Sequence, residues 1–176
     1  MKHTLVALVE DKPGVLNRIA SLFRRRAFNI ESLTVGRTHE PEVSRMTIQV
    51  DTALTAPNLV EANLSKLVNV IDVHDVTHTP TVVRDLALIK VRADAGALGE
   101  INQLADIFRA KIVDVASDSV ILEVTGDEDK VSGLVELLRS RGIIEMVRTG
   151  QIAMVRGSVN ESGTKKRMNG NGNGSH

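Results

Sequence analysis

The chain has 176 residues, of which 42% are hydrophobic, and its 22 basic residues balance its 22 acidic residues. This length and apolar content suit one large domain or two small ones, and the zero net charge leaves no field that attracts nucleic acid, a membrane surface or a polyanion. The chain has no cysteine, which excludes disulfides, thiolate catalysis and zinc–thiolate sites, and only 2% aromatic residues, which leaves no platform for base stacking.

Within the first residues, MKHTLVALVEDK, we expect a strand over about residues 5–10. Their apolar run is too short for a secretory signal or a membrane span, so we expect a cytoplasmic protein.

The unit that organises the chain is residues 10–36, which combine an acidic loop, an amphipathic helix and a strand. Asp11 is a favourable N-cap, Pro13 suits the first helical turn, and Gly14 lets other atoms approach the backbone. Apolar residues then recur at helical spacing and predict one buried stripe: Val15, Leu16, Ile19, Leu22 and Phe23. Asn29 begins the strand that follows.

A helix that begins directly after a strand and a glycine loop points free backbone N–H groups at whatever lies above its start. Such a helix start attracts an anion. With the carboxylate of Asp11 beside it, the loop could hold both ends of a zwitterion, the carboxylate on the N–H groups and the ammonium on the aspartate. The alternative, that Asp11 only caps the helix and Gly14 only turns the chain, stays open at this point.

The rest of the first half adds two strands and a helix. Residues 45–51 alternate as a strand that pairs with the preceding strand as a hairpin, and residues 71–78 form a fourth strand. Between them a helix begins near Thr55 or Ala56, with apolar residues at helical spacing: Leu59, Val60, Leu64, Leu67 and Val68. The order βαββαβ predicts a ferredoxin-like α+β domain with two helices on one face of an antiparallel sheet.

The same pattern then repeats, so we expect two tandem ferredoxin-like domains, residues 1–79 and 80–156. The second copy carries its helical stripe on Leu98, Ile101, Leu104, Ala105 and Phe108. It has Ala93-Asp94-Ala95-Gly96 where the first copy has the DKPG loop, so the chemistry of the first loop is not duplicated. Residues 157–176 are rich in Gly and Asn and are predicted to be a disordered tail.

Catalytic machinery is not indicated, because the sequence has no nucleophile elbow, no phosphate loop and no dinucleotide fingerprint. His74 and His78 lie at the end of a predicted strand, where a solvated edge is favoured over a metal site. Asn29 either helps the helix to end or offers its amide to a ligand. If two copies pair along an exposed sheet edge, Asn29 of one chain can approach the Asp11–Gly14 loop of the other.

These residues resemble the small regulatory subunit of acetohydroxyacid synthase, also called acetolactate synthase. The resemblance rests on VEDKPGVLNRIASLF, FNIESLTVG, SRMTIQV and the weaker second copy around IFRAKIVDV, and it covers about residues 2–156. It implies an N-terminal ACT domain that senses an amino acid and dimerises, followed by an ACT-like domain.

The resemblance also implies a partner and an effector. Small subunits of this family bind the catalytic large subunit, raise its activity and confer feedback inhibition by valine, sometimes by other branched-chain amino acids. The large subunit carries thiamine diphosphate, magnesium and FAD, and this chain would carry none of them. The complex joins two pyruvates, or pyruvate and 2-oxobutanoate, with loss of carbon dioxide, in branched-chain amino acid biosynthesis.

The implied effector site has two walls. One is Asp11, Lys12, Pro13, Gly14, Val15 and Leu16; the other is Asn29, Ile30 and Thr34 from the partner chain. The chain departs from the family pattern twice. Many bacterial members have Asn in place of Asp11, and many have Gly in place of Ala27, at a turn where a left-handed residue favours Gly and Ala costs about 1 kcal/mol.

Two alternatives remain in view. One is an amino-acid-sensing tandem ACT protein that regulates a different enzyme or a transcription factor. The other is a metal-binding or nucleic-acid-binding ferredoxin fold, which the composition disfavours.

Overall fold

The computed structural model describes residues 2–51, 57–94 and 96–157, and its first half follows the predicted order of elements. Its elements are β1 (Lys2–Glu10), α1 (Val15–Arg25), β2 (Asn29–Arg37), β3 (Val43–Asp51), α2 (Pro57–Leu64) and β4 (Val70–Asp75). The four strands form an antiparallel sheet in the order β2-β3-β1-β4, which leaves β2 and β4 at its edges.

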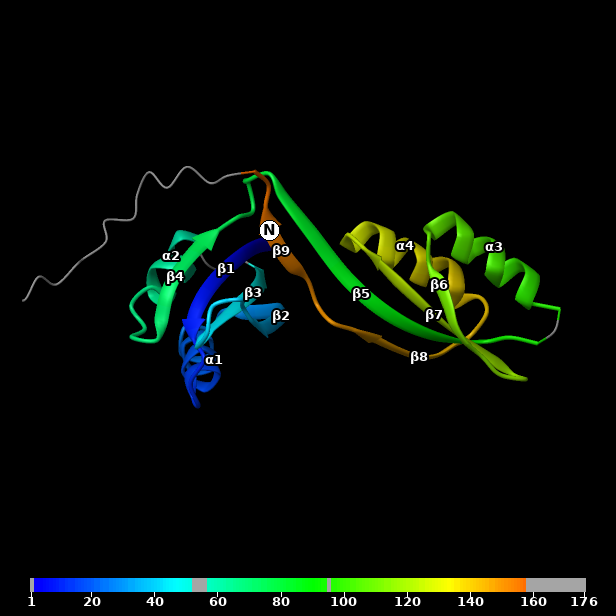
Figure 1. Cartoon of the computed structure of the whole chain (residues 1–176), viewed down its shortest axis with the longest axis horizontal. Helices are drawn as coiled ribbons and strands as arrows, with labels where there is room; N and C mark the ends of the chain where they lie inside the picture. Colours follow the sequence, from blue (N-terminus) through cyan, green and yellow to red (C-terminus); the bar gives the residue numbers. More distant parts are fainter. Residues whose placement is uncertain (1, 52–56, 95, 158–176) are drawn as a thin grey trace, which may run out of the picture.

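The second half repeats this arrangement. Its elements are β5 (Thr81–Arg92), α3 (Leu98–Phe108), β6 (Lys111–Val115), β7 (Ser119–Gly126), α4 (Glu128–Arg139), β8 (Ile143–Arg148) and β9 (Ile152–Val155). The sheet order is β6-β7-β5-β8, the counterpart of the first sheet, with β9 paired to the beginning of β5. The predicted α+β class and the two tandem ferredoxin-like units are therefore confirmed, and Figure 1 shows them side by side.

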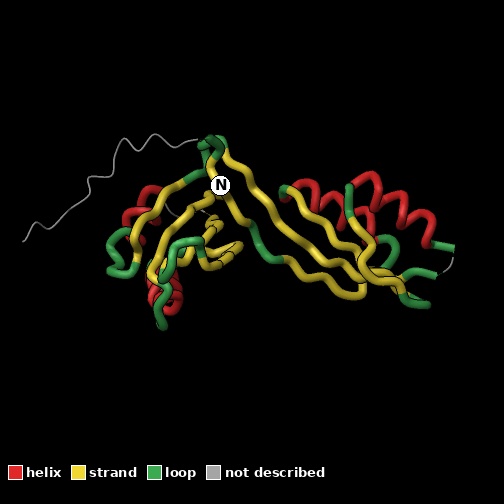
Figure 2. The backbone as a smooth tube through the Cα atoms, viewed as in Figure 1, coloured by secondary structure: helices red, strands yellow, loops and turns green. Residues whose placement is uncertain are grey.

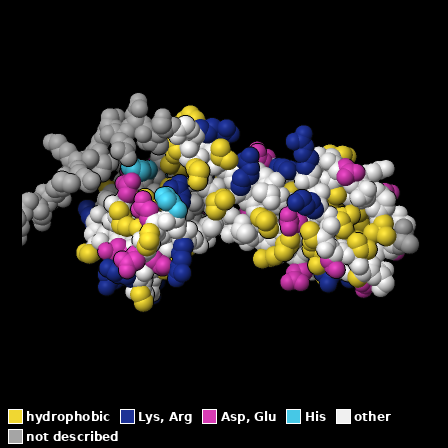
Figure 3. Space-filling model, in the orientation of Figure 1, with side chains coloured by type: hydrophobic (Ala, Val, Ile, Leu, Met, Phe, Trp, Pro, Cys, Tyr) yellow, Lys and Arg dark blue, Asp and Glu magenta, His cyan; other side chains and the backbone are white. Residues whose placement is uncertain are grey.

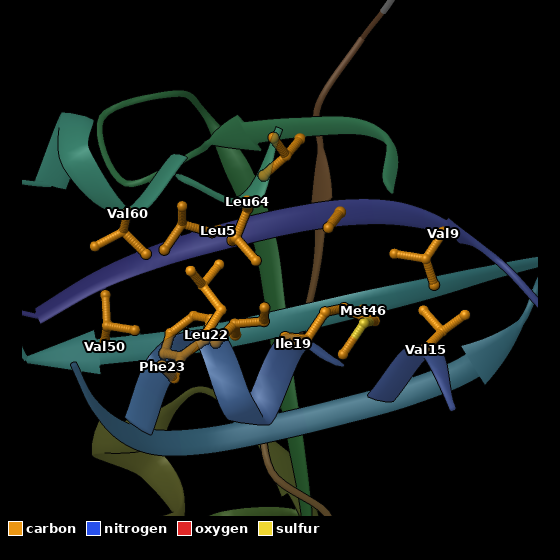
Figure 4. Packing of buried hydrophobic residues seen from close by; sticks show 13 residues of the cluster. Leu5, Val9, Val15, Ile19, Leu22, Phe23, Met46, Val50, Val60 and Leu64 are labelled. Carbon is orange, nitrogen blue, oxygen red and sulfur yellow. The ribbon is translucent and has the colours of Figure 1, made fainter. Parts of the chain in front are cut away.

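Helix α1 packs on the first sheet because its apolar residues fall three and four positions apart. Val15, Ile19, Leu22 and Phe23 are buried against Leu5, Val9, Met46 and other sheet residues, as Figure 4 shows. Each buried side chain of this size stabilises the fold by about 1.5–3 kcal/mol. Leu16, predicted to belong to the same stripe, is instead 49% exposed at the start of the helix.

The second core is built the same way. The alternating residues Ala87, Ile89 and Val91 of β5 lie under Ile101 and Ala105 of α3 and under one face of α4. Among the predicted stripe, Leu98, Leu104 and Phe108 are half-buried at the margin of this core.

The expected end of the second helix needs correction. Helix α2 ends at Leu64, so Leu67 and Val68 follow it rather than continuing it; Leu67 N–H donates to Leu64 O at 2.9 Å, and Val68 is 89% exposed. The predicted start of this helix, Thr55 or Ala56, lies outside the described residues. Strand β9 was not predicted from the sequence, and all but the first residue of the predicted tail lie outside the described residues.

The junction between the halves is a two-stranded ribbon. The first four residues of β5 pair with β9, so the chain returns from the second sheet toward the first before the described part ends at residue 157. Figure 2 shows these two extended segments running side by side from one half to the other.

The turn between α1 and β2 is left-handed, as the sequence suggested for a family position where Gly is common. Ala27 has a φ of 54°, and Phe28 N–H donates to Phe23 O at 3.0 Å to close the helix. A residue with a Cβ is strained in this conformation.

We therefore expect Ala27→Gly to stabilise the fold by about 1 kcal/mol. Ala20→Gly is the matched control, because Ala20 is exposed inside α1 with helical geometry, and there glycine should destabilise by about 1 kcal/mol. Urea unfolding of the two variants measures both effects. Equal destabilisation by the two glycines would contradict the strain at Ala27.

Candidate functional site

The start of α1 is open. Gly14 occupies the N-cap with a left-handed φ of 84°, and within the described part of the chain no side chain caps the N–H groups of the first turn. Gly14 O accepts the first helical hydrogen bond, from Arg18 N–H at 3.0 Å. The prediction that Asp11 caps this helix is wrong. The N–H groups that a capping side chain would occupy are left for another acceptor.

The helix starts of the second half differ from each other: α4 has a side-chain cap, whereas the N-cap of α3, Ala97, has none. Asp127 Oδ1 accepts from Lys130 N–H at 2.9 Å at the start of α4, and Asp94 Oδ1 accepts from Ala97 N–H at 2.9 Å before α3. The first turn of α1 contains no acidic residue, whereas those of α3 and α4 do. The start of α1 therefore combines the lack of a side-chain cap with the lack of a carboxylate in its first turn, in keeping with the sequence difference between the two loops.

Asp11 is held away from the helix start by Arg37. Asp11 Oδ2 lies 3.0 Å from Arg37 Nε, and Asp11 N–H donates to Glu42 O at 2.7 Å. Arg37 ends β2, whose register places it beside Ser44, and Ser44 in turn pairs with Val9 at the end of β1. This register places Arg37 at the loop, and Arg37 was not among the predicted site residues.

A second carboxylate borders the same loop. Glu10 accepts a hydrogen bond from the Asn69 amide at 2.5 Å and lies 3.2 Å from the Lys12 ammonium. The Asn69 hydrogen bond, followed by that of Lys12, holds the pKa of Glu10 below its ordinary value. The loop before the uncapped helix start thus contains two carboxylates, Glu10 paired with Lys12 and Asp11 paired with Arg37. Glu10 and Asn69 were not among the predicted site residues.

The predicted loop residues are accessible. Asp11, Lys12, Pro13 and Gly14 are exposed, as is Leu16, while Val15 is 5% exposed and belongs to the core. An apolar side chain at the mouth of a polar loop can contact the aliphatic part of a ligand whose charged groups lie on the loop.

The second predicted wall lies at the opposite end of the sheet. Asn29 pairs with Asp51, which pairs with Lys2, whereas the loop follows the other end of β1. Eight steps along β2 separate Asn29 from Arg37, a distance of about 26 Å at the usual strand rise. Asn29 is exposed and Ile30 half-buried. One chain therefore does not bring the two walls together.

Thr34 is placed differently from the other predicted residues. Its hydroxyl donates to Thr149 O of the second half at 3.3 Å, on the sheet face away from α1. It belongs to the contact between the halves rather than to the Asn29 end of β2.

The described histidines form no metal centre. His74 is exposed and pairs with Asp72 at 2.8 Å, and His78 lies edge-on to His3 with ring centroids 6.0 Å apart. His3 Nδ1 is 2.8 Å from Asp75 Oδ2. Desolvation by itself raises the pKa of Asp75, but hydrogen bonds from Thr77 and His3 lower it below its ordinary value. In the described ranges, no three His, Asp or Glu side chains gather closely enough to hold a metal ion.

The surface mixes charges, as the neutral composition suggested. Figure 3 shows acidic and basic side chains interspersed over one face. Among the described residues, no helix is both long and apolar enough to cross a membrane.

Comparisons with known proteins match nearly the whole described chain. Residues 5–72 match the family described as the AHAS small subunit-like ACT domain, and residues 84–157 match the small subunit of acetolactate synthase. The probable acetolactate synthase small subunit of Archaeoglobus fulgidus is 55% identical over 90% of this chain and 99% of that relative. The acetolactate synthase small subunit of Mycolicibacterium smegmatis is 46% identical over 88% and 91%.

A solved structure agrees with this likeness. The crystal structure of the acetolactate synthase small subunit from Thermotoga maritima superposes with a TM-score of 0.82 at 41% identity, covering 90% of this chain and 99% of that one.

Proposed function

Because this chain belongs to the family of acetolactate synthase small subunits, we propose that it activates the catalytic large subunit and makes it sensitive to feedback inhibition by valine or another branched-chain amino acid. Thiamine diphosphate, magnesium and FAD belong to the large subunit in this proposal, and the chain contributes regulation alone. We place the complex in the cytoplasm.

The observation that carries the proposal is the separation of the two half-sites along β2. This strand is a sheet edge, and Leu33 stands midway between Asn29 and Arg37. Antiparallel pairing of β2 with a second copy about a two-fold axis near Leu33 would set Asn29 of one chain beside Arg37 of the other. Arg37 pairs with Asp11, so the Asn29 wall would arrive at the Asp11 loop.

The loop chemistry suits an α-amino acid. The ligand carboxylate would accept hydrogen bonds from the uncapped N–H groups of α1, and Asp11 and Glu10 would face its ammonium. The exposed side chain of Leu16 and the half-buried Ile30 of the partner would contact a branched aliphatic side chain. Asn29 would add an amide donor and acceptor.

The assignment is tested by acetolactate formation from pyruvate with all three cofactors present. We expect the large subunit to gain activity when this chain is added and to lose that gain with valine, while this chain alone forms no acetolactate. Acetolactate formed by the chain alone, or no effect on the large subunit, would contradict the proposal. If valine instead inhibited a different enzyme that co-purifies with this chain, the result would favour the alternative of a tandem ACT protein that regulates another enzyme.

Gly14→Asp tests whether the uncapped start of α1 binds the ligand carboxylate. The left-handed φ of Gly14 strains any residue with a Cβ at this position, although Asp and Asn adopt this conformation more readily than most residues. A Cβ at this position would meet no described atom within 4 Å. We expect Gly14→Asp to weaken valine inhibition about tenfold or more, because two like charges close together repel strongly outside bulk water.

Gly14→Asn is the matched control, since it has the same size and backbone tolerance without the charge. Valine titration of the two reconstituted complexes separates charge from strain. Equal inhibition midpoints in the two variants would show that the ligand carboxylate does not bind at this helix start.

Val35→Lys tests the shared edge. Val35 is 45% exposed on β2, and a lysine on an edge strand disfavours pairing with another chain. We expect the wild type to sediment as a dimer, and this variant to dissociate and to lose valine binding with it. Val113→Lys is the control, because Val113 is 50% exposed on β6, the corresponding edge of the second sheet. A monomer that still binds valine would exclude a shared site.

A further inference from the structure

The chain returns from the second half to lie against the open face of the first sheet. We call Thr149–Ala153 the return segment. Ala153 is buried with Val6 and Val76 of the first half, and Ala153 O accepts a hydrogen bond from Arg45 Nη2 at 2.8 Å. The second half is therefore held on the first by more than the covalent link before β5.

Polar contacts fix the return segment on β2 and β3. Gln151 N–H donates to Ser32 Oγ at 3.2 Å, Thr34 Oγ1 donates to Thr149 O at 3.3 Å, and the buried Gln49 amide donates to Gln151 Oε1 at 2.7 Å. Ser32 and Thr34 alternate along β2 and so share the face opposite α1. Strand β2 therefore has Asn29 and Ile30 at its beginning and contacts the second half through its middle residues.

Gly150 sits closest to β2. Its φ is 84°, and a Cβ added to it would stand 2.6 Å from Ser32 Oγ and 2.9 Å from Thr34 Oγ1. Either hydroxyl could move only by giving up its hydrogen bond to the return segment. Glycine is required here both for the backbone conformation and for the closeness of the two chains.

A second link starts at the bulge in β2. The register shifts between Ile30 and Ser32, which leaves Glu31 as the extra residue. Lys2 Nζ lies 3.0 Å from Glu31 and 3.0 Å from Glu128 at the start of α4. Glu128 also accepts a hydrogen bond from the Gln151 amide at 3.3 Å. The residue after Ile30 is thereby connected to a helix of the second half.

The rest of the junction is loosely filled. A cavity of about 460 Å³ lies between β2, β3 and the ribbon, and its lining includes Arg37, Arg45, Arg84, Ile152 and Met154. Side chains on the ribbon remain open there, since Ile152 is 56% exposed and Met154 66% exposed. Because apolar packing leaves room at this junction, the polar contacts around Gly150 are a substantial part of what joins the two halves.

We propose that Gly150 is a positioning residue that couples the Asn29–Ile30 end of β2 to the orientation of the second half. Effector bound at that end shifts the bulge and the Ser32–Thr34 segment, and the return segment carries the shift to the second half. This inference rests on the proposed function. An effector can move this equilibrium only by binding the two orientations with different affinity.

The first test measures the orientation directly in the full chain. The chain contains no native cysteine, so Ala20→Cys on α1 and Gln103→Cys on α3, both exposed positions, accept a pair of spin labels. Labelled chain is diluted with unlabelled chain so that each dimer carries at most one pair. We expect one narrow distance distribution that shifts with valine, and a broad distribution that valine does not shift in Gly150→Ala.

Gly157→Ala is the matched control, because Gly157 is also left-handed, with a φ of 71°, and its added Cβ would meet no described atom within 4 Å. The Gly157→Ala variant therefore has backbone strain like that of Gly150→Ala, but no steric clash of the added Cβ. Ser32→Ala provides a second variant without backbone strain, and it should broaden the distribution to a smaller degree because Gln151 N–H loses its acceptor.

The second test separates effector binding from its consequence. By calorimetry, Gly150→Ala should bind valine within about twofold of Gly157→Ala. In the reconstituted complex its maximal inhibition by valine should fall at least about fivefold relative to that control. A purely structural role would change binding and inhibition together.

The outcomes distinguish failure of the Gly150 coupling from failure of the proposed function. If Gly150→Ala matches Gly157→Ala in both distance distribution and inhibition, the coupling is overturned. If the wild type neither binds valine nor affects the large subunit, the proposed function fails. The label distances in the chain alone still show whether Gly150 sets the orientation.

Discussion

The edge strand β2 contains most of the residues on which the proposed sensing of an amino acid depends. β2 pairs with β3 on one side only, and along its length it presents Asn29 at one end, Ser32 and Thr34 in the middle, and Arg37 at the other end. Backbone groups on an unpaired edge favour pairing with another strand. A second copy at this edge would complete the ligand site, and any displacement of the strand would reach the second half through the residues between.

The difference between the two copies of the fold lies in how their helices begin. Asp127 caps α4 in the second copy, and the first turns of α3 and α4 carry acidic residues, while α1 in the first copy has neither a side-chain cap nor an acidic first turn, and Asp11 pairs with Arg37 instead. An unpaired helix start forgoes about 1 kcal/mol of capping stability, which a bound carboxylate restores. Under the proposed function, the same fold holds a ligand in one copy and acts as a scaffold in the other.

The sequence predicted the fold well because its apolar residues follow helical and strand periods and the pattern repeats. It failed where a tertiary contact overrides a local preference: Asp11 prefers to cap, but the hairpin register brings Arg37 to it. Leu16 fits the apolar stripe yet lies beyond the sheet that would bury it, and Thr34 is drawn to the return segment. β9 was missed because four residues without strong alternation become a strand only through pairing with β5. The site walls were named from a resemblance, and their placement on opposite ends of the sheet required the register.

The most direct measurement of the central claim, a ligand site shared between two chains, uses mixed dimers. Gly14→Asp damages the loop of one chain and Asn29→Ala damages the wall of the other, and the two are co-expressed with different tags and purified as the mixed species. In a shared site one loop and one wall remain intact together, so the mixed dimer should bind one valine per two chains although each variant alone binds poorly. If each chain held a complete site of its own, every chain in the mixture would be defective, and a mixed dimer without valine binding would contradict the account.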